Sequence, residues 1–427
     1  ENFRGKLPII IEGLMSEWPA IKERKWSKNS IRKIYGNRTV NVASGAGIVY
    51  SGGGQTRGMT IEHFLKNNSE DNNESPSGKD FIFDVGFLAH NPQLLEDFWT
   101  PHYFESFSGA KNNEIRKSWY ILSLGGSHSG LPYHVHAETW LGLVFGKKKW
   151  FVYPPGKSPS SAALDGAKFH PLMGVYEYQT RVLPLLMKKD KPLEFVQKAG
   201  DVVYLPSNWK HATLNLGEAI GVGGQAAYSS AEREKDCLKV LEHNPHDIDG
   251  LRGYGLSLAH QGISEPEGGG LGEDGIDKRT KILRKSADQF YKAVSLQPGD
   301  PELVLLLGEV LLHLNEIKAA RDVAHHALEA LNSTYLPNDV PASTLVAART
   351  NIARFMTNTG LHGEAEKLIR EVLNDGGIFV EALIVLCTAL AGQGKWKDAV
   401  FEIDEALKRF PHSSELNDFT KWLRKQK

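Results

Sequence analysis

The chain has 427 residues, of which 41% are hydrophobic and 24% charged, and its formal net charge at pH 7 is −1. This length exceeds what one hydrophobic core usually organises, so we expect two domains with the composition of an ordinary globular protein. The balanced charge argues against a nucleic-acid binder, and two cysteines, Cys237 and Cys387, exclude a disulfide framework.

Residues 1–230 are expected to form a β-rich domain. Between Leu7 and Gln225, short β-branched and aromatic runs are separated by Gly, Pro and Asn, which is the pattern of antiparallel strands with a few helices near the N-terminus. The segment at about 66–79 is rich in Asn and Ser and almost without apolar residues, so it is expected to be a mobile surface loop. The clearest strand runs are Leu7–Glu12, Arg38–Ala43, Trp119–Leu124, Gly142–Tyr153 and Asp201–Leu205.

Histidine is concentrated in the middle of this domain. His134, His136 and Glu138 alternate along an expected strand, so their side chains are predicted to share one face. A further histidine, His211, follows a strand, a Pro turn and a Trp. Non-haem Fe(II) oxygenases hold their metal with two His and one carboxylate on one side, which leaves the opposite positions open. The spacing therefore predicts a divalent metal site.

Five blocks of the first domain resemble the small jumonji-C (JmjC) hydroxylases, and the resemblance covers residues 7–225. The blocks occur together and in the family's order: Phe81–Phe87, Leu94–Pro101, Ser129–His134, Gly146–Pro155 and Gly200–Asn215. This resemblance implies a double-stranded β-helix, the jelly-roll fold of cupins. It also implies an Fe(II)- and 2-oxoglutarate-dependent oxygenase that hydroxylates a side chain of a protein substrate.

The resemblance assigns residues to the two cofactors. His134 and His211 match the family's two metal-binding histidines. Lys148, two residues after a hairpin glycine, matches the lysine that binds the far carboxylate of 2-oxoglutarate, for which a buried ammonium is a sound physical choice. Asn215, at the end of the last block, is assigned to the same cofactor site. The flanking Lys147 and Lys149 are expected to be solvated.

The chain departs from the family at the acidic ligand. Where most members have Asp, this sequence has His136, which leaves two ligand sets open. Either His134, His136 and His211 bind the metal together, or Glu138 binds it beside His134 or His136. A neutral ligand in place of an anion raises the net charge of the centre and should change how readily Fe(II) activates O2. The alternative to an oxygenase is therefore a catalytically inactive JmjC protein that acts as an interaction scaffold.

Residues 231–427 are expected to form an all-α solenoid of tetratricopeptide repeats. The hydrophobic period changes to 3.6 from about Ala231 onward. Small and apolar residues recur in one register, as in tetratricopeptide repeats, with insertions at about 262–279 and 331–343. The residues are Ser286, Phe290, Ala293 and Pro298, then Gly308, Leu311, Ala320, Ala324 and Ala327, then Ala365 and Ile369, then Ala399, Ile403, Ala406 and Pro411.

Such a solenoid is expected to bind a protein or peptide, as substrate or partner, on its concave side. Bracing the first domain or forming a homodimer is the alternative. No apolar run is long enough to span a membrane and no signal segment is visible, although the start at Glu1 leaves removal of an upstream segment open. Four glycosylation sequons favour the endoplasmic reticulum lumen over the cytoplasm. They lie at Asn37, Asn67, Asn73 and Asn332.

Overall fold

The structure is a computed structural model, and it divides the chain into two compact units. The first unit comprises Glu1–Val49, Gly58–Gly250 and Asp339–Pro341, and the second comprises Tyr50–Arg57, Leu251–Asn338 and Ala342–Lys427. The structure describes residues 4–50, 57–67, 80–104, 120–159, 169–226, 229–266, 276–332, 336, 340, 342–375, 379–411 and 413–426. Most of the predicted loop at 66–79 lies outside these residues, as do the centres of the two predicted insertions. The domain boundary between residues 230 and 231 stays a prediction.

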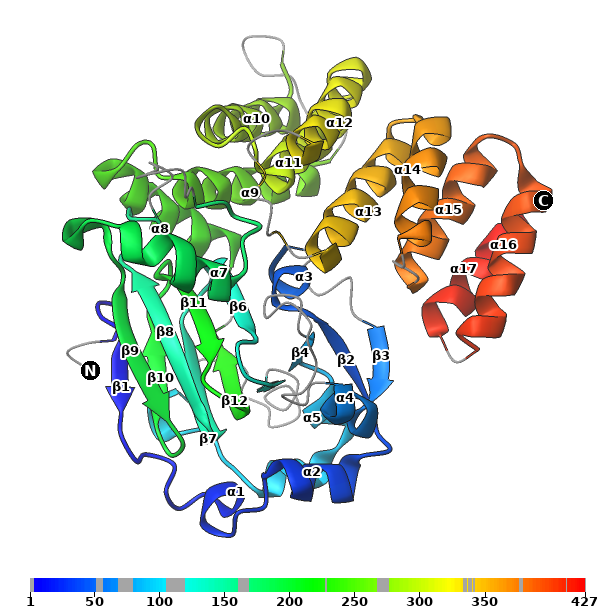
Figure 1. Cartoon of the computed structure of the whole chain (residues 1–427). Coiled ribbons are helices and arrows are strands. Elements are labelled where there is room, and N and C mark those ends of the chain that lie inside the picture. The colour runs from blue at the N-terminus through cyan, green and yellow to red at the C-terminus, as the bar shows by residue number, and fades with distance from the viewer. Residues whose placement is uncertain are drawn as a thin grey trace. The chain divides into compact units, whose positions relative to one another are not determined.

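The first unit is built on two sheets of antiparallel strands (Figure 1). One sheet has the strand order β1-β10-β7-β12-β5-β4-β2-β3, and the other has the order β6-β11-β8-β9. From β5 to β12 successive strands alternate between the two sheets, apart from the pair β8 and β9, and this connectivity is that of a jelly roll. The predicted cupin fold is therefore confirmed, and each predicted strand run coincides with an observed strand or hairpin.

The strands have the following bounds: β1 Ile9–Ile11, β2 Thr39–Ser44, β3 Arg57–Thr60, β4 Asp80–Asp84, β5 Tyr120–Gly125, β6 Gly130–His134, β7 Thr139–Phe145, β8 Lys147–Tyr153, β9 Leu193–Lys198, β10 Val202–Leu205, β11 Lys210–Asn215 and β12 Ala219–Gln225. The helices of this unit are α1 Pro19–Lys22, α2 Lys28–Tyr35, α3 Gly45–Tyr50, α4 Ile61–Asn67, α5 Phe87–His90, α7 Val175–Glu177 and α8 Ser230–His243.

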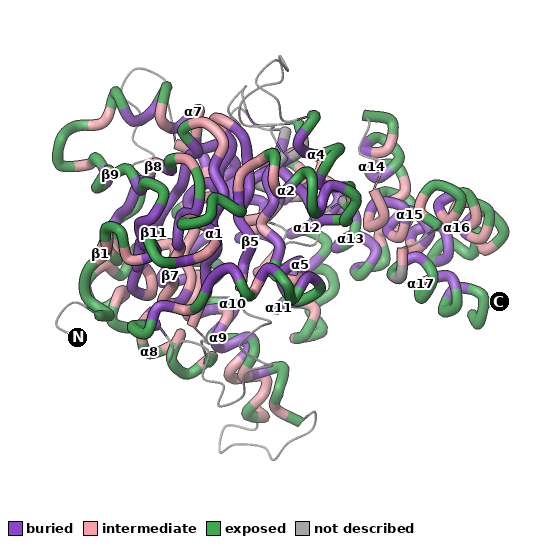
Figure 2. Tube along the Cα trace, turned by 90° about the horizontal axis from the view of Figure 1, so that it is seen from below, coloured by how far each residue is buried: buried purple, intermediate pink, exposed green. Residues whose placement is uncertain are grey.

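The N-terminal helices pack on one face of the large sheet, where they form the main hydrophobic core (Figure 2). Trp140 on β7 is 2% exposed, and its ring lies nearly parallel to that of Phe104 at a centroid distance of 5.8 Å. Trp18, just before α1, contacts the same indole edge-on at 6.4 Å. Aromatic packing of this kind buries a large apolar area on the outer face of the sheet and stabilises the fold.

A second core covers the outer face of the small sheet. Phe151 and Tyr153 of β8 pack there with Tyr178 and Val182 from the segment between β8 and β9. Because side chains alternate along a strand, Lys148 on β8 lies on the opposite, inner face. The same alternation in β11 places Ala212 outward and the neighbouring site residues inward. The candidate site residues of the small sheet thus point into the interior of the barrel.

The second unit consists of helices, in agreement with the predicted all-α domain (Figure 1). Consecutive helices joined by short connections pack against each other, as α11 packs on α12 and α13 on α14. They are α9 Ile248–Ser264, whose first turn still belongs to the first unit, and α10 Lys278–Leu296, α11 Pro301–His313, α12 Ile317–Asn332, α13 Ala342–Asn358, α14 His362–Asn374, α15 Val380–Gly392, α16 Trp396–Arg409 and α17 Ser414–Lys425. No helix in the described part of the chain is long and apolar enough to cross a membrane.

The predicted small residues do allow close helix packing. Ala320, Ala365 and Ala399 are fully buried, as their shared register requires. At Gly308 an added Cβ would lie 2.4 Å from the ring of Phe355, because α13 approaches α11 directly at that point. At these four positions the burial and packing agree with the predicted register.

Gly308→Ala is expected to destabilise the helical unit by about 1–3 kcal/mol, because overpacking outweighs the better helix propensity of alanine. Urea unfolding followed by far-UV circular dichroism measures this loss. Gly363→Ala on α14 is the matched control, since a Cβ there meets nothing within 4 Å. Equal unfolding midpoints for Gly308→Ala and the unmodified protein would contradict the packing argument.

Candidate metal centre

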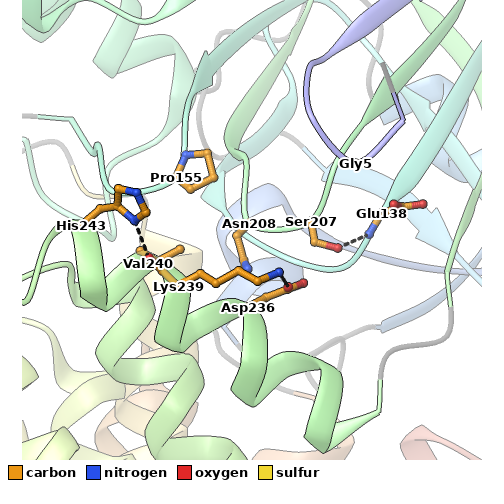
Figure 3. Close-up of a pocket in the computed structure, with 9 residues that line it drawn as sticks. All are labelled: Gly5, Glu138, Pro155, Ser207, Asn208, Asp236, Lys239, Val240 and His243. Atoms are coloured by element: carbon orange, nitrogen blue, oxygen red, sulfur yellow. Dashed lines mark hydrogen bonds and ion pairs between the residues drawn. The ribbon is translucent and has the colours of Figure 1, made fainter. Parts of the chain in front are cut away.

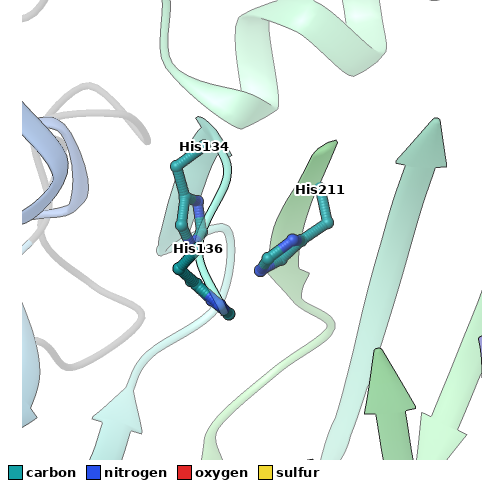
Figure 4. A group of neighbouring side chains, drawn as sticks. All are labelled: His134, His136 and His211. Carbon is teal, nitrogen blue, oxygen red and sulfur yellow. The ribbon is translucent and has the colours of Figure 1, made fainter. Parts of the chain in front are cut away.

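Three histidines converge inside the first unit (Figure 4). His134 ends β6 and lies directly opposite His211 of β11 in the register of the small sheet, while His136 follows two residues beyond the end of β6. The ring centroids are 4.3 Å apart for His134 and His211 and 4.7 Å apart for His136 and His211. One potential ligand nitrogen from each ring lies within 4.8 Å of the others.

Hydrogen bonds to the backbone fix the tautomer of each ring. Every Nδ1 atom lies 2.7–2.8 Å from a main-chain carbonyl oxygen. The carbonyls that accept from His134, His136 and His211 are those of Pro132, Ala137 and Trp209, respectively. Because a carbonyl can only accept, each Nδ1 carries the proton and each Nε2 is left with a free lone pair. Outer hydrogen bonds of this kind orient metal-binding histidines.

The electrostatics of the cluster favour a bound cation. Burial lowers the pKa of His134 to about 3, and it also lowers the pKa values of His136 and His211. The imidazoles therefore stay neutral, which is the form that binds metals. One potential ligand nitrogen of each ring lies within 4.8 Å of the other two, and a first-row divalent ion could be bound by all three. The residues present fit such an ion.

Glu138 lies outside this cluster, although the sequence placed it on the same face. Strand β6 ends at His134, so the alternation of side chains does not continue to residue 138. The Glu138 Oε2 atom accepts a hydrogen bond from Arg4 Nε at 3.3 Å. The backbone N–H of Glu138 donates to Ser207 Oγ at 3.1 Å. Of the two ligand sets left open by the sequence, the arrangement favours His134 with His136 and His211.

Lys148 is the second unusual group inside the barrel. Its side chain is 1% exposed, its Nζ donates to Asn215 Oδ1 at 2.7 Å, and it lies 5.2 Å from the ring centroid of Phe81. Burial lowers the pKa of Lys148 to about 7, and within the described part of the chain its ammonium has no ion-pair partner. Of the flanking lysines, Lys147 is exposed as expected, whereas Lys149 is half-buried and pairs with Glu194 at 2.8 Å. A buried cation without an anion suits a carboxylate ligand.

A hydrogen-bond chain orients the Asn215 amide toward this lysine. Asn215 Nδ2 donates to Ser129 Oγ at 3.1 Å, and Ser129 Oγ donates to the Gly126 carbonyl at 2.7 Å. The amide oxygen is thereby directed to Lys148. The sequence did not identify Ser129 as a site residue. Its position at the start of the block Ser129–His134 was the one feature that could have pointed to it.

Comparisons with known proteins agree with this geometry. Residues 3–222 match the model of a family described as a cupin-like domain. The lysine-specific demethylase JMJ21 of Arabidopsis thaliana is 27% identical over 231 residues, covering 52% of this chain and 23% of the relative. The bifunctional arginine demethylase and lysyl-hydroxylase psr-1 of Caenorhabditis briggsae is 28% identical over 236 residues, covering 51% and 55%.

A third relative is the 2-oxoglutarate and iron-dependent oxygenase JMJD4 of Danio rerio, which is 23% identical over 178 residues and covers 38% of this chain and 40% of its own length. The chain thus spans between about a quarter and about half of the length of these curated relatives. The family match at residues 3–222 includes both the three-histidine cluster and Lys148.

Proposed function

The chain belongs to the cupin-like domain family, and on that basis we propose that it is an Fe(II)- and 2-oxoglutarate-dependent oxygenase. The observation that carries the proposal is the convergence of His134, His136 and His211, with each Nδ1 proton held by a carbonyl and each Nε2 lone pair free. A site of that kind is ordered by the fold before metal binds, so metal binding does not have to order the ligands.

The side chains divide the work between the two cofactors. The three histidines would hold Fe(II) from one side, which leaves positions on the other side for 2-oxoglutarate and O2. When bound, Fe(II) supplies the redox chemistry that couples decarboxylation of 2-oxoglutarate to oxidation of a C–H bond. Lys148 would bind the far carboxylate through a charge-assisted hydrogen bond, and Asn215 would keep the ammonium in place.

We propose that the product is a hydroxylated side chain in a protein. Support comes from a relative whose name includes lysyl-hydroxylase and from another described as an iron- and 2-oxoglutarate-dependent oxygenase. The helical repeats of the second unit would bind the same protein or a partner, and so would supply affinity away from the reacting carbon. A homodimer and the cellular compartment stay predictions.

The experiment that tests this proposal is succinate formation from 2-oxoglutarate by the full chain with Fe(II), ascorbate and O2, in the presence of candidate protein extracts. Succinate is expected to appear and to stop when a chelator removes the metal. Inactivity in every extract, together with no calorimetric binding of Mn(II) and 2-oxoglutarate, would exclude the oxygenase.

The alternative function is an inactive scaffold, and it is supported by His136, which stands where most of the family has a carboxylate. His136→Asp distinguishes the two, because it restores an anionic ligand at that position. An inactive protein that gains succinate formation in His136→Asp would be a scaffold that has lost turnover. An active protein that loses activity in the same variant would be an oxygenase adapted to three neutral ligands.

A further inference from the structure

A polar groove of about 520 Å³ lies in the first unit (Figure 3). One wall is formed by helix α8, and the other is formed by the connections that lead into β7 and β11. Its lining residues in the two walls and floor include Asp236, Lys239, Val240, His243, Ser207 and Asn208. This volume is within the range of sites that enclose ligands of several residues or rings.

The groove and the metal centre share the same two loops. The backbone N–H of Asn208 donates to the carbonyl of His136 at 3.1 Å, and Asn208 precedes His211 by three residues. The adjoining Ser207 accepts from the backbone of Glu138, which itself lines the groove. A molecule in the groove would therefore contact the loop that carries His136 and the turn that leads into β11 and His211.

The walls offer both donors and acceptors. Asp236 and Glu138 present carboxylates whose side chains are 30% and 22% exposed, and Lys239 presents an ammonium that is 59% exposed. Lys239 pairs with Asp236 at 3.3 Å, and His243 uses Nδ1 to donate to the Lys239 carbonyl, so its Nε2 remains for a ligand. Exposed ion pairs of this length contribute little, so a ligand can replace them.

We propose that this groove holds an extended peptide segment of the substrate, with its main chain bound between α8 and the Ser207–Asn208 turn. A peptide main chain presents N–H and C=O groups in alternation, which matches the mixed polar walls, and the apolar surface of Val240 contacts side chains. The 2-oxo acid is an unsuitable occupant, since its carboxylate has a cationic partner in Lys148 inside the barrel. This inference rests on the proposed oxygenase function and names its substrate class.

The test uses short random peptides displayed and selected on the immobilised full chain, with binding of the enriched peptides measured by fluorescence anisotropy. Val240→Trp places an indole in the groove and is expected to weaken binding by about tenfold or more. Leu238→Trp is the matched control, because Leu238 is on the same helix, is 38% exposed and does not line the groove. Lys239→Trp gives a second blocking variant at an exposed position that tolerates the change.

Two results would overturn the proposal. One is equal affinity of the selected peptides for Val240→Trp, Lys239→Trp and Leu238→Trp, with circular dichroism showing all three folded. The other is the enrichment of no peptide over the bare matrix. Since peptide binding is measured without turnover, the two hypotheses can fail separately. Groove-dependent peptide binding in a protein that forms no succinate in any extract and binds neither Mn(II) nor 2-oxoglutarate would reject only the oxygenase. Succinate formation unaffected by Val240→Trp would reject only the groove.

Discussion

His211→Ala is expected to abolish specific metal binding and, with it, all 2-oxoglutarate turnover. The substitution leaves His134 and His136 as the only imidazoles of the cluster, and a pair of neutral ligands holds a divalent ion poorly. Loss of a hydrogen bond to a metal ligand alone typically costs 10–100-fold in affinity, so loss of the ligand itself should cost on the order of a hundredfold or more. Anaerobic calorimetry with Mn(II), which resists oxidation, measures the change.

The melting temperature gives a second measure of the same prediction. A metal that binds only the folded chain raises stability with its concentration, so the unmodified protein should gain melting temperature on metal addition and His211→Ala should not. His90→Ala is the control, since His90 is exposed and its Nδ1 bonds to the Gly86 carbonyl within its own turn. A full metal-induced shift in His211→Ala would place the metal elsewhere.

The pH dependence of the metal-free protein follows from the same buried rings. The folded-state pKa of His134 is about 3, well below the value of about 6.5 for an unfolded histidine. The unfolded chain therefore binds more protons between these values, and the stability contributed by the neutral rings is lost as pH falls below about 6.5. Metal binding in that window should hardly weaken, because protons do not compete for rings that stay neutral.

Periodicity explains why the architecture was readable in the sequence. Alternation in Arg38–Ala43 and a short continuous apolar run in Asp201–Leu205 are both strand patterns whatever the strand's partners are, and these runs matched β2 and β10. In the second unit, small residues recur where helices pack closely, and a Cβ added at Gly308 would lie 2.4 Å from the ring of Phe355. Local rules of this kind require no knowledge of the tertiary structure.

The site was less readable, because its geometry depends on where strands end. If β6 continued past His134, Glu138 would share the face of the two histidines. The strand ends at His134, however, and the Glu138 carboxylate pairs with Arg4. The carbonyls that fix the imidazole tautomers belong to backbone positions that carry no sequence signal. The groove against α8 joins residues far apart in the chain, such as Ser207 and Lys239, and no pattern in the sequence pairs them.

Lys148→Met is expected to weaken 2-oxoglutarate binding while the fold survives. A hydrogen bond to a charged group contributes about 1.5–3 kcal/mol, so the loss should be roughly 10- to 100-fold in affinity. The folded protein should not suffer, because methionine fills a similar space beside Phe81 and needs no anion. Lys147→Met, at the exposed neighbouring position, is the control for both measurements.

The sign of the pH effect distinguishes a ligand-binding lysine from a structural one. The folded-state pKa of Lys148 is about 7 against 10.5 for an ordinary lysine, so without ligand the burial penalty is fully present below about pH 7 and fades as pH rises toward 10.5. Lys148→Met should therefore exceed the unmodified protein in stability most clearly below pH 7. Binding of the 2-oxo acid brings an anion to Nζ and favours its charged form, so it should take up a proton above pH 7 and weaken as pH rises further. Calorimetry in buffers of different ionisation enthalpy measures that uptake, and its absence at pH 8 would show that the carboxylate binds away from Lys148.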